Sequence, residues 1–377
     1  MTERLFVDIH VIETLPPSCV NRDDLGSPKT ACYGGVTRAR VSSQAWKRAI
    51  RMEFEAMGEE IGQRTKRLSN LLTEQIRMLA PDTQNGQELA EKLLHEVNLK
   101  VKKDHTLSTL FFISPAQLRA LAQVIVEYGV PEEPKKPSDK ASDEKKAAYQ
   151  AEKDEYETYK AKRDAAIREN PSLDVALFGR MLAENKELNC DACAQVAHAL
   201  STHEIHNEFD YFTAVDDVAP DSGAGYLDTM EFNSSTMYRY ATVNALELQK
   251  YLGEQTPHAI CAFVKAFILS MPAGKQNSYA NRVRPDAVYV TVRKDQPVNM
   301  AGAFECPVQA GKDGYVEASV QRLTAYAKET LNYCDEPALE LTVGRGMESL
   351  AEPGKLPVLL DTLEKDLTAR LEGKEVK

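Results

Sequence analysis

The chain has 377 residues, a formal net charge of −11 at pH 7 and an apolar content of 43%. This length and composition indicate a globular protein with room for two or three modules and a real hydrophobic core. We find no apolar signal region, no run of membrane-spanning length and seven scattered cysteines, so we expect a cytoplasmic protein with reduced thiols and no contact with a membrane.

The first predicted strand covers residues 5–12. Its apolar side chains alternate and predict one buried face, made by Leu5, Val7, Ile9 and Val11. His10 falls on the opposite face. We expect a sheet-surface histidine there, because a general base needs a partner and a pocket that the sequence does not indicate.

Cations are concentrated in residues 16–51, which carry seven lysines and arginines against two acids. Residues 36–41 predict a strand with Arg38 and Arg40 on one face. A helix follows, capped by Ser42 or Ser43 and ended by Gly58. A helix N-terminus flanked by cations attracts anions, and we expect phosphate. The candidate phosphate ligands of this stretch are Arg22, Lys29, Arg38, Arg40, Ser42, Gln44, Lys47 and Arg51.

The chain after Gly58 is predicted to be helical over a long distance. Residues 66–79, 87–97 and 115–128 are amphipathic, and residues 142–169 predict one exposed, charged helix. This last helix is either a solvated arm or a contact to a neighbouring subunit through its tyrosines, Tyr149, Tyr156 and Tyr159.

Residues 188–201 are predicted as one helix that carries Cys190 and Cys193. Structural zinc sites favour paired ligands on a turn, and His198 would lie on another face of such a helix. We therefore expect core thiols and no metal site.

Residues 204–231 contain eight acids and no lysine or arginine. The segment also carries apolar side chains around a turn with Pro220, Gly223 and Gly225. Tyr211, Phe212, Val215 and Leu227 are among them. This combination predicts a projecting β-hairpin with an apolar edge, and an ordinary surface loop is the alternative.

The C-terminal part predicts strands at residues 236–243, 287–293 and 339–343, and helices at 256–271, 316–334 and 357–371. Tyr238 and Tyr240 share one strand face, where they either stack on bases or pack in the core. Lys275 and Lys312 lie in glycine-containing loops that either contact a phosphodiester or are plain turns.

Several of these pieces occur together in one known family. The string NRDD, the following lysine, an aromatic-Gly-Gly, the basic strand and SSQ resemble the backbone subunit of the type I-E CRISPR Cascade complex, the CasC family. DVALFGRM at 174–181, FDYFTAVDD at 209–217, YRYATVN at 238–244 and GKQNSYAN at 274–281 extend this resemblance over most of the chain.

Element order and resemblance give one expected fold. The class is α+β, with a ferredoxin-like or RRM-like core (the palm), a large helical insertion (the fingers) and a projecting β-hairpin (the thumb). We expect these segments: 1–58, first part of the palm with the RNA-backbone-binding region; 59–181, fingers including the exposed helix 142–169; 182–203, a palm helix; 204–233, thumb; 234–377, remainder of the palm.

The resemblance implies a binding protein without catalytic residues, cofactor or metal. Its implied partners are CRISPR RNA, target DNA through guide pairing, further copies of itself head to tail, and other Cascade subunits. It implies RNA-backbone contacts by Arg22, Lys29, Ser42, Gln44, Lys47 and Arg51, and displacement of bases by Met181 and Leu227.

Two other classes stay open at this point. An RNA-cleaving enzyme on the same fold would use Asp23 or Asp24, which otherwise pair with Arg22 and orient it. A protein scaffold without nucleic acid would use the basic stretch to bind an acidic partner.

Overall fold

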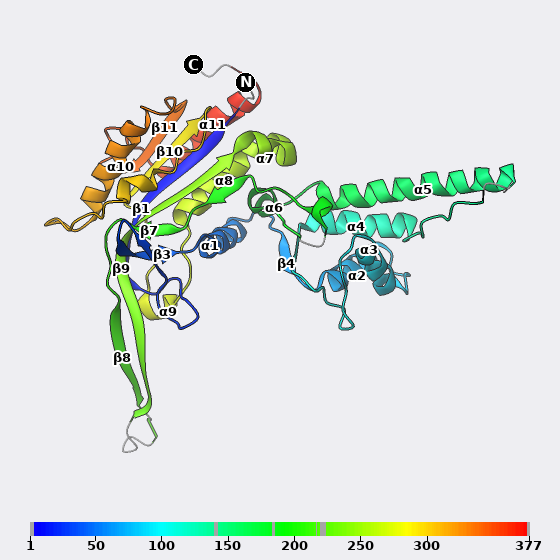
Figure 1. Ribbon diagram of the computed structural model, residues 1–377, viewed down its shortest axis with the longest axis horizontal. Coiled ribbons are helices and arrows are strands. Elements are labelled where there is room, and N and C mark those ends of the chain that lie inside the picture. The colour runs from blue at the N-terminus through cyan, green and yellow to red at the C-terminus, as the bar shows by residue number, and fades with distance from the viewer. Residues whose placement is uncertain (1–3, 139–141, 183–184, 216, 219–223, 375–377) are drawn as a thin grey trace. The chain divides into compact units, whose positions relative to one another are not determined.

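The computed structural model describes residues 4–138, 142–182, 185–215, 217–218 and 224–374. The chain divides into two compact units (Figure 1). Unit 1 contains residues 1–58, 194–249 and 254–377, and unit 2 contains residues 59–193 and 250–253. The chain therefore leaves unit 1 after Gly58, builds unit 2, and returns.

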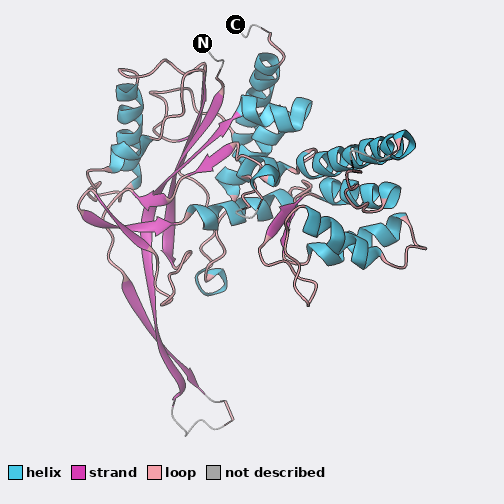
Figure 2. Ribbon diagram, turned by 45° about the vertical axis from the view of Figure 1, so that its right-hand side comes forward, coloured by secondary structure: helices cyan, strands magenta, loops and turns pink. Residues whose placement is uncertain are grey.

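Unit 1 is built on an antiparallel sheet, shown in Figure 2. The strand order is β11-β10-β1-β9-β7-β3-β2, with β6 and β8 also paired to β9. The strands are β1 (Phe6–Ser18), β2 (Thr30–Tyr33), β3 (Val36–Val41), β6 (Ala194–Val196), β7 (Ala199–Ser201), β8 (Glu208–Val215), β9 (Ala224–Asn244), β10 (Ala287–Arg293) and β11 (Leu339–Gly344).

Helices cover both faces of this sheet. The α-helices described in unit 1 are α1 (Ser43–Ala56), α7 (Ala245–Leu252), α8 (Thr256–Leu269), α9 (Gln276–Tyr279), α10 (Val316–Thr330) and α11 (Leu356–Leu371). Trp46 of α1 packs with Leu15 on one face, where α8 contacts both α1 and α11. Leu323 of α10 packs with Ile12 and Tyr238 on the other face. Tyr238 and Tyr240 are therefore core residues, and neither is open for stacking on a base.

Because helices cover both faces of the sheet, the side chain of His10 is buried. Val7, Ile9 and Val11 are buried as predicted, but His10 is buried as well, so the expectation of a sheet-surface histidine is wrong. Its Nδ1 lies 2.9 Å from the hydroxyl of Tyr238. Burial lowers the pKa of His10 to about 3, and the ring is neutral at physiological pH. Periodicity identified one apolar face and could not show that α10 covers the polar one.

Unit 2 is mainly helical, with a small sheet of two strands. Its elements are β4 (Gln63–Thr65), α2 (Leu68–Leu79), α3 (Gly86–Glu96), β5 (Phe111–Ile113), α4 (Pro115–Tyr128), α5 (Asp143–Arg168), α6 (Leu173–Phe178) and the 3₁₀ turn η1 (Lys186–Leu188). The predicted helices are thus confirmed to within a few residues. Ser114 shows why α4 begins where it does, because it forms a complete capping box with Gln117.

The long helix α5 has no buried residue in its N-terminal part, whereas its C-terminal part has one buried face. Tyr159 is fully buried and donates to Glu96 at 2.7 Å, and Arg163 pairs with Glu96 at 3.0 Å. The C-terminal part packs on α4. The prediction of an exposed charged helix is therefore wrong for this part, and Tyr159 is not available to a neighbouring subunit.

The predicted palm helix at 182–203 is also wrong. The described residues of this stretch form η1 and the strands β6 and β7. Alanines 194, 197 and 199 gave the stretch its helical propensity, but β9 offers a long strand to pair with: Ala194 lies opposite Val243, and Leu200 opposite Tyr238. Tertiary pairing overrides a weak local preference here.

Candidate nucleic-acid interface

Helix α1 begins as the sequence predicts. Ser42 is its N-cap, and the Ser42 hydroxyl accepts the N–H of Ala45 at 3.3 Å. Trp46, Ile50 and Phe54 are buried on one face, and Gly58 follows with a positive φ of 84°. No acidic side chain stands in the first turn. The positive end of the helix dipole is therefore left for an external anion.

The loop before β2 is fixed against this helix end. The side chain of Asn21 accepts the N–H of Ser42 at 2.9 Å. Asp23 accepts the N–H groups of Leu25 and Ser27 at 2.9 and 3.0 Å. The Asp23 carboxylate thus holds a tight turn, and none of the ion pairs seen among the described residues joins it to Arg22. The expected pairing of Asp23 with Arg22 is replaced by this turn.

Lys275 reaches the same place from the far end of the sequence. A Cβ on Gly274 would lie 2.3 Å from the carbonyl oxygen of Val20, so the loop before α9 touches the loop before β2. Burial raises the pKa of the Cys19 thiol, while the charges of Arg22 and Lys275 act on it in the opposite direction. Both cations therefore lie near one buried thiol.

Lys29 and Arg40 form a second pair of neighbouring cations. Arg40 donates to the carbonyl of Thr30 at 3.0 Å, and its Nη1 lies 3.2 Å from Nδ1 of His198. Partial burial lowers the pKa of His198, and the charges of Arg40 and Lys29 lower it further. His198 therefore stays neutral and adds no charge of its own at physiological pH.

We call the surface made by these groups the cationic face. It joins the two cation pairs to the first turns of α1, where Gln44 is exposed and Lys47 and Arg51 lie half-buried one turn apart. Its members are Arg22, Lys29, Arg40, Gln44, Lys47, Arg51 and Lys275. Ser42, also predicted as a phosphate ligand, is buried beneath this face, where its hydroxyl caps α1.

Arg282 is a cation of this region that the sequence prediction missed. It follows α9 and lies 3.6 Å from Glu53 of α1. The signal was present, because Arg282 and Arg284 directly follow the GKQNSYAN string. Lysine and glycine in the preceding loop drew the prediction to Lys275 instead.

Arg38 does not belong to the cationic face. Its side chain is 0% exposed, and its guanidinium donates to main-chain carbonyls of Tyr33, Ser201, Phe304 and Glu305. Residues 304–305 and β7 enclose it, although alternation correctly gives it the same strand face as Arg40. Arg38 was predicted as an RNA-backbone ligand, and the structure shows that it is a core arginine instead.

Lys312 is exposed at the tip of a separate turn. Gly311 and Gly314 bond each other through both main-chain groups, at 3.0 and 3.4 Å, and hold Lys312 between them. The turn follows residues 304–305, which accept hydrogen bonds from Arg38 of β3, so the start of the turn is fixed to the β2–β3 end of the sheet.

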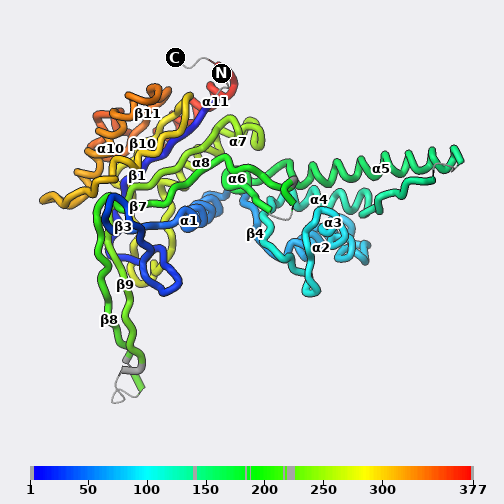
Figure 3. Tube along the Cα trace, viewed as in Figure 1, coloured from blue at the N-terminus to red at the C-terminus, as the bar shows by residue number. Residues whose placement is uncertain are grey.

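The predicted hairpin is formed by β8 and the first part of β9, and it extends away from the sheet (Figure 3). Register places Phe209, Tyr211 and Leu227 on one face, where they are 66%, 65% and 54% exposed. Phe212 lies on the other face with Tyr226, at a ring distance of 6.0 Å. Tyr226 is 55% exposed, so both faces of the hairpin carry exposed apolar or aromatic side chains. The side chain of Val215 lies outside the described residues.

Met181 belongs to unit 2 and is 88% exposed. It follows Gly179, whose φ of 74° and tight fit against the carbonyl of Cys190 fix the turn, and Arg180, whose guanidinium is buried among carbonyls. The same turn borders a shallow pocket of about 560 Å³, which Arg64 and Phe112 also line. Met181 is therefore presented to solvent from a rigid turn.

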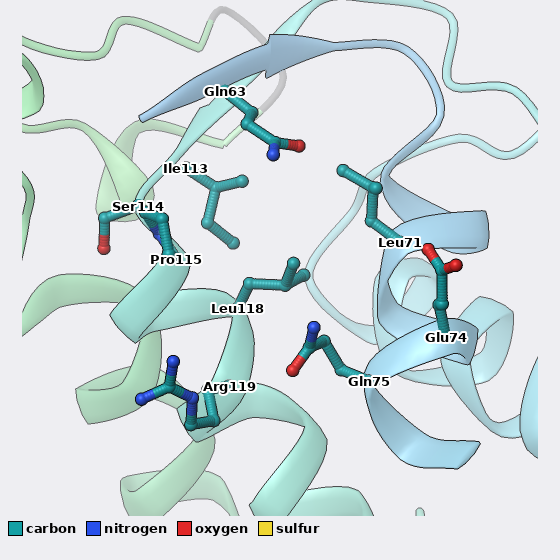
Figure 4. A pocket seen from close by; sticks show the side chains of 9 residues that line it. All are labelled: Gln63, Leu71, Glu74, Gln75, Ile113, Ser114, Pro115, Leu118 and Arg119. Atoms are coloured by element: carbon teal, nitrogen blue, oxygen red, sulfur yellow. The ribbon is translucent and has the colours of Figure 1, made fainter. Parts of the chain in front are cut away.

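A smaller pocket of about 190 Å³ lies between α2 and α4 (Figure 4). Its walls combine aliphatic side chains, two glutamines, one carboxylate and one guanidinium: Gln63, Leu71, Glu74, Gln75, Ile113, Ser114, Pro115, Leu118 and Arg119. This lining contains neither a pair of carboxylates nor a nucleophile beside a base. Among the described residues, no three His, Cys, Asp or Glu side chains are grouped to hold a metal ion.

Comparison with known proteins assigns the class. A family model described as "CT1975-like protein" matches residues 7–364, so the chain belongs to that family. A solved chain from a "CRISPR RNA-guided surveillance complex, pre-nicking" is 33% identical, with a TM-score of 0.76, over 96% of this chain and all of that one. A second chain, from a "CRISPR RNA-guided surveillance complex", is 29% identical with a TM-score of 0.60, over 96% of this chain and 99% of that one.

These matches confirm the resemblance to a Cascade backbone-type protein. No curated protein matches the chain. Within the described part of the chain, no helix is long and apolar enough to cross a membrane.

Proposed function

We propose that this protein is a non-catalytic backbone subunit of a type I-E Cascade complex that binds CRISPR RNA through its phosphates. The observation that carries the proposal is the cationic face, which gathers cations from residues 22–51 and from Lys275 on an otherwise acidic protein. Such a concentration of cations is the electrostatic footprint of nucleic-acid binding. Lys312 adds a further cation on its own turn.

The connectivity supports an RRM-like palm. The elements β1, α1, β7, β9, α8 and β10 follow each other in the chain, and the sheet order within them is β10-β1-β9-β7. This is the order 4-1-3-2 of a ferredoxin-like βαββαβ unit with unit 2 inserted after α1. Unit 2 then corresponds to the fingers, and the β8–β9 hairpin to the thumb.

Copies assemble head to tail in this proposal. The hairpin projects exposed apolar side chains from the sheet, and a patch that meets a different patch on the next copy extends as a filament unless rotation closes a ring. Leu227 and Met181 would displace a base at each junction, since apolar wedges are a known way to unstack bases. The guide held this way pairs with target DNA, and other Cascade subunits complete the assembly.

Catalysis is not part of this proposal. Asp23, one of the two acidic residues suspected in the alternative RNA-cleaving enzyme beside Asp24, uses its carboxylate to hold the turn before β2. That role accounts for its presence without a metal. The scaffold alternative predicts a protein that purifies without nucleic acid.

The test is the salt dependence of RNA binding. Each single-strand phosphate contact contributes about −0.7 to the slope of log affinity against log salt. Lys47→Ala should weaken binding to all sequences alike and flatten the slope by about that amount. Lys365→Ala is the control: this exposed lysine of α11 pairs with Asp361 and is not a member of the cationic face, so its loss should leave both unchanged. A base-selective loss at unchanged slope would contradict phosphate-driven binding.

A further inference from the structure

The β2–β3 turn is in direct contact with the segment that leads to Lys312. Gly34 in this turn has a φ of 61°, and a Cβ there would lie 1.7 Å from the carbonyl oxygen of Glu305. The hydroxyl of Tyr33 donates to the carbonyl of Ala301 at 3.2 Å. Two segments about 270 residues apart in the sequence are thus in contact, through the main chain at Gly34 and through the side chain of Tyr33.

Arg38 is the centre of this junction. Its guanidinium donates to Tyr33 at 3.1 Å, to Ser201 at 3.0 Å, and to Phe304 and Glu305 at 2.8 and 3.3 Å. All four acceptors are carbonyl oxygens, and they come from three separate segments. The planar fork of arginine can satisfy several carbonyls in fixed directions, which the single ammonium of lysine cannot do.

Cations of the proposed RNA interface lie on both sides of the junction. On one side, Arg40 stands two residues after Arg38 on the same strand, beside Lys29. On the other side, the chain continues from Glu305 to Val308, which is buried and bonds the carbonyl of Thr202 at 3.0 Å. The glycine-bounded turn with Lys312 follows directly.

We infer that Arg38 is a positioning residue that sets the spacing between Lys312 and the Lys29–Arg40 pair. The inference rests on the proposed function. A rigid junction holds the Lys312 turn so that the Lys312 ammonium contacts the same RNA strand as Lys29 and Arg40. The conformational entropy of this turn is then lost when the protein folds and not when RNA binds. Arg38 itself touches no phosphate.

A double-mutant cycle on RNA binding tests this role. In the wild-type background, Lys312→Ala should flatten the salt slope by about 0.7. Arg38→Met removes the fork but keeps an apolar side chain of similar length. It should flatten the slope by a similar amount, and Lys312→Ala should then have no further effect. A full additional effect of Lys312→Ala in the Arg38→Met background, or no effect in the wild type, would overturn the inference.

A milder change at the same junction tests the inference even if Arg38→Met does not fold. Tyr33→Phe removes only the bond to Ala301 and should reduce the effect of Lys312→Ala to part of its wild-type size. If that effect is undiminished in Tyr33→Phe and Arg38→Met does not fold, the inference fails.

Arg180 supplies a matched control. It is a second buried arginine bonded to carbonyls of Phe112, Ile167 and Leu188, and it belongs to unit 2. Arg180→Met should leave the effect of Lys312→Ala at full size, since Arg180 does not touch the junction.

Lys47→Ala separates the positioning role of Arg38 from the proposed function. If Lys47→Ala flattens the salt slope in every background while the effects of Arg38→Met and Lys312→Ala are additive, only the positioning role fails. Absence of RNA binding by the wild type would overturn both.

Discussion

Two regions of the sheet in unit 1 are rich in polar side chains, and they differ in what covers them. The face under α10 carries Asp8, His10, Tyr238 and Tyr240, and all four are buried. The β2–β3 edge, with the first turns of α1, carries Lys29, Arg40 and Gln44, which reach solvent at least in part. RRM-type modules stack bases on aromatic side chains of the sheet face. Here that face is closed, so the function that we propose uses the edge for nucleic-acid binding.

The comparison therefore separates stability from binding. Changes on the covered face should alter the free energy of unfolding and leave the salt slope of RNA binding unchanged. Changes at the edge or on the hairpin should alter binding and leave unfolding nearly unchanged.

The largest expected effect is at Asp8 on the covered face. Its carboxylate accepts the N–H of Val298 at 2.8 Å and the hydroxyl of Tyr240 at 3.0 Å. Burial raises the pKa of Asp8 to about 6. The folded state therefore binds the proton more tightly than the unfolded state, and stability falls as pH rises from about 4 to about 6. A shift of this size corresponds to roughly 3 kcal/mol.

Asp8→Asn should remove this part of the pH dependence. The difference in unfolding free energy between variant and wild type, measured by denaturant titration at pH 4 and pH 7, should change by that amount. RNA binding at constant pH should keep its salt slope. A pH dependence identical in both proteins would contradict the raised pKa, and a changed slope would contradict the separation of the two regions.

The next effect is at Leu227 on the hairpin. Burying one leucine side chain is worth about 1.5–3 kcal/mol, so Leu227→Asp should weaken assembly on long RNA at least tenfold and spare one copy on a short RNA. Thr229→Asp places the same charge on the same hairpin face without removing an apolar group, and it should cost less. Equal losses on short and long RNA would argue against a hairpin interface between copies.

A smaller effect is expected at Asp23. Asn can accept the two N–H groups that hold the turn, whereas Ala cannot. Asp23→Asn should therefore keep RNA affinity close to wild type, and Asp23→Ala should lower it several-fold, as measured by filter binding. A magnesium-dependent RNA cut that disappears in Asp23→Asn would favour the enzyme alternative.

Sequence patterns predicted local structure well in this chain. The strand at 36–41, the cap at Ser42 and the helices of unit 2 depend on alternation, capping residues and amphipathic spacing within a short window. These signals are local, and so are the structures that they determine.

The failures all involve distant segments. Arg38 and Arg40 have the same pattern in the sequence, and only the arrival of β7 and residues 304–305 distinguishes the buried one from the partly exposed one. The strands β6 and β7 likewise exist because β9 pairs with them. Lys275 was found through its glycine-containing loop, yet its position near Arg22 is set by the contact of Gly274 with Val20.

The most direct test of RNA-directed assembly is native mass spectrometry of the protein on RNAs of increasing length. The number of bound copies should rise in regular steps with RNA length, since each copy needs its own stretch of backbone on its cationic face. A fixed copy number on RNAs of different length, or no bound RNA, would contradict the account.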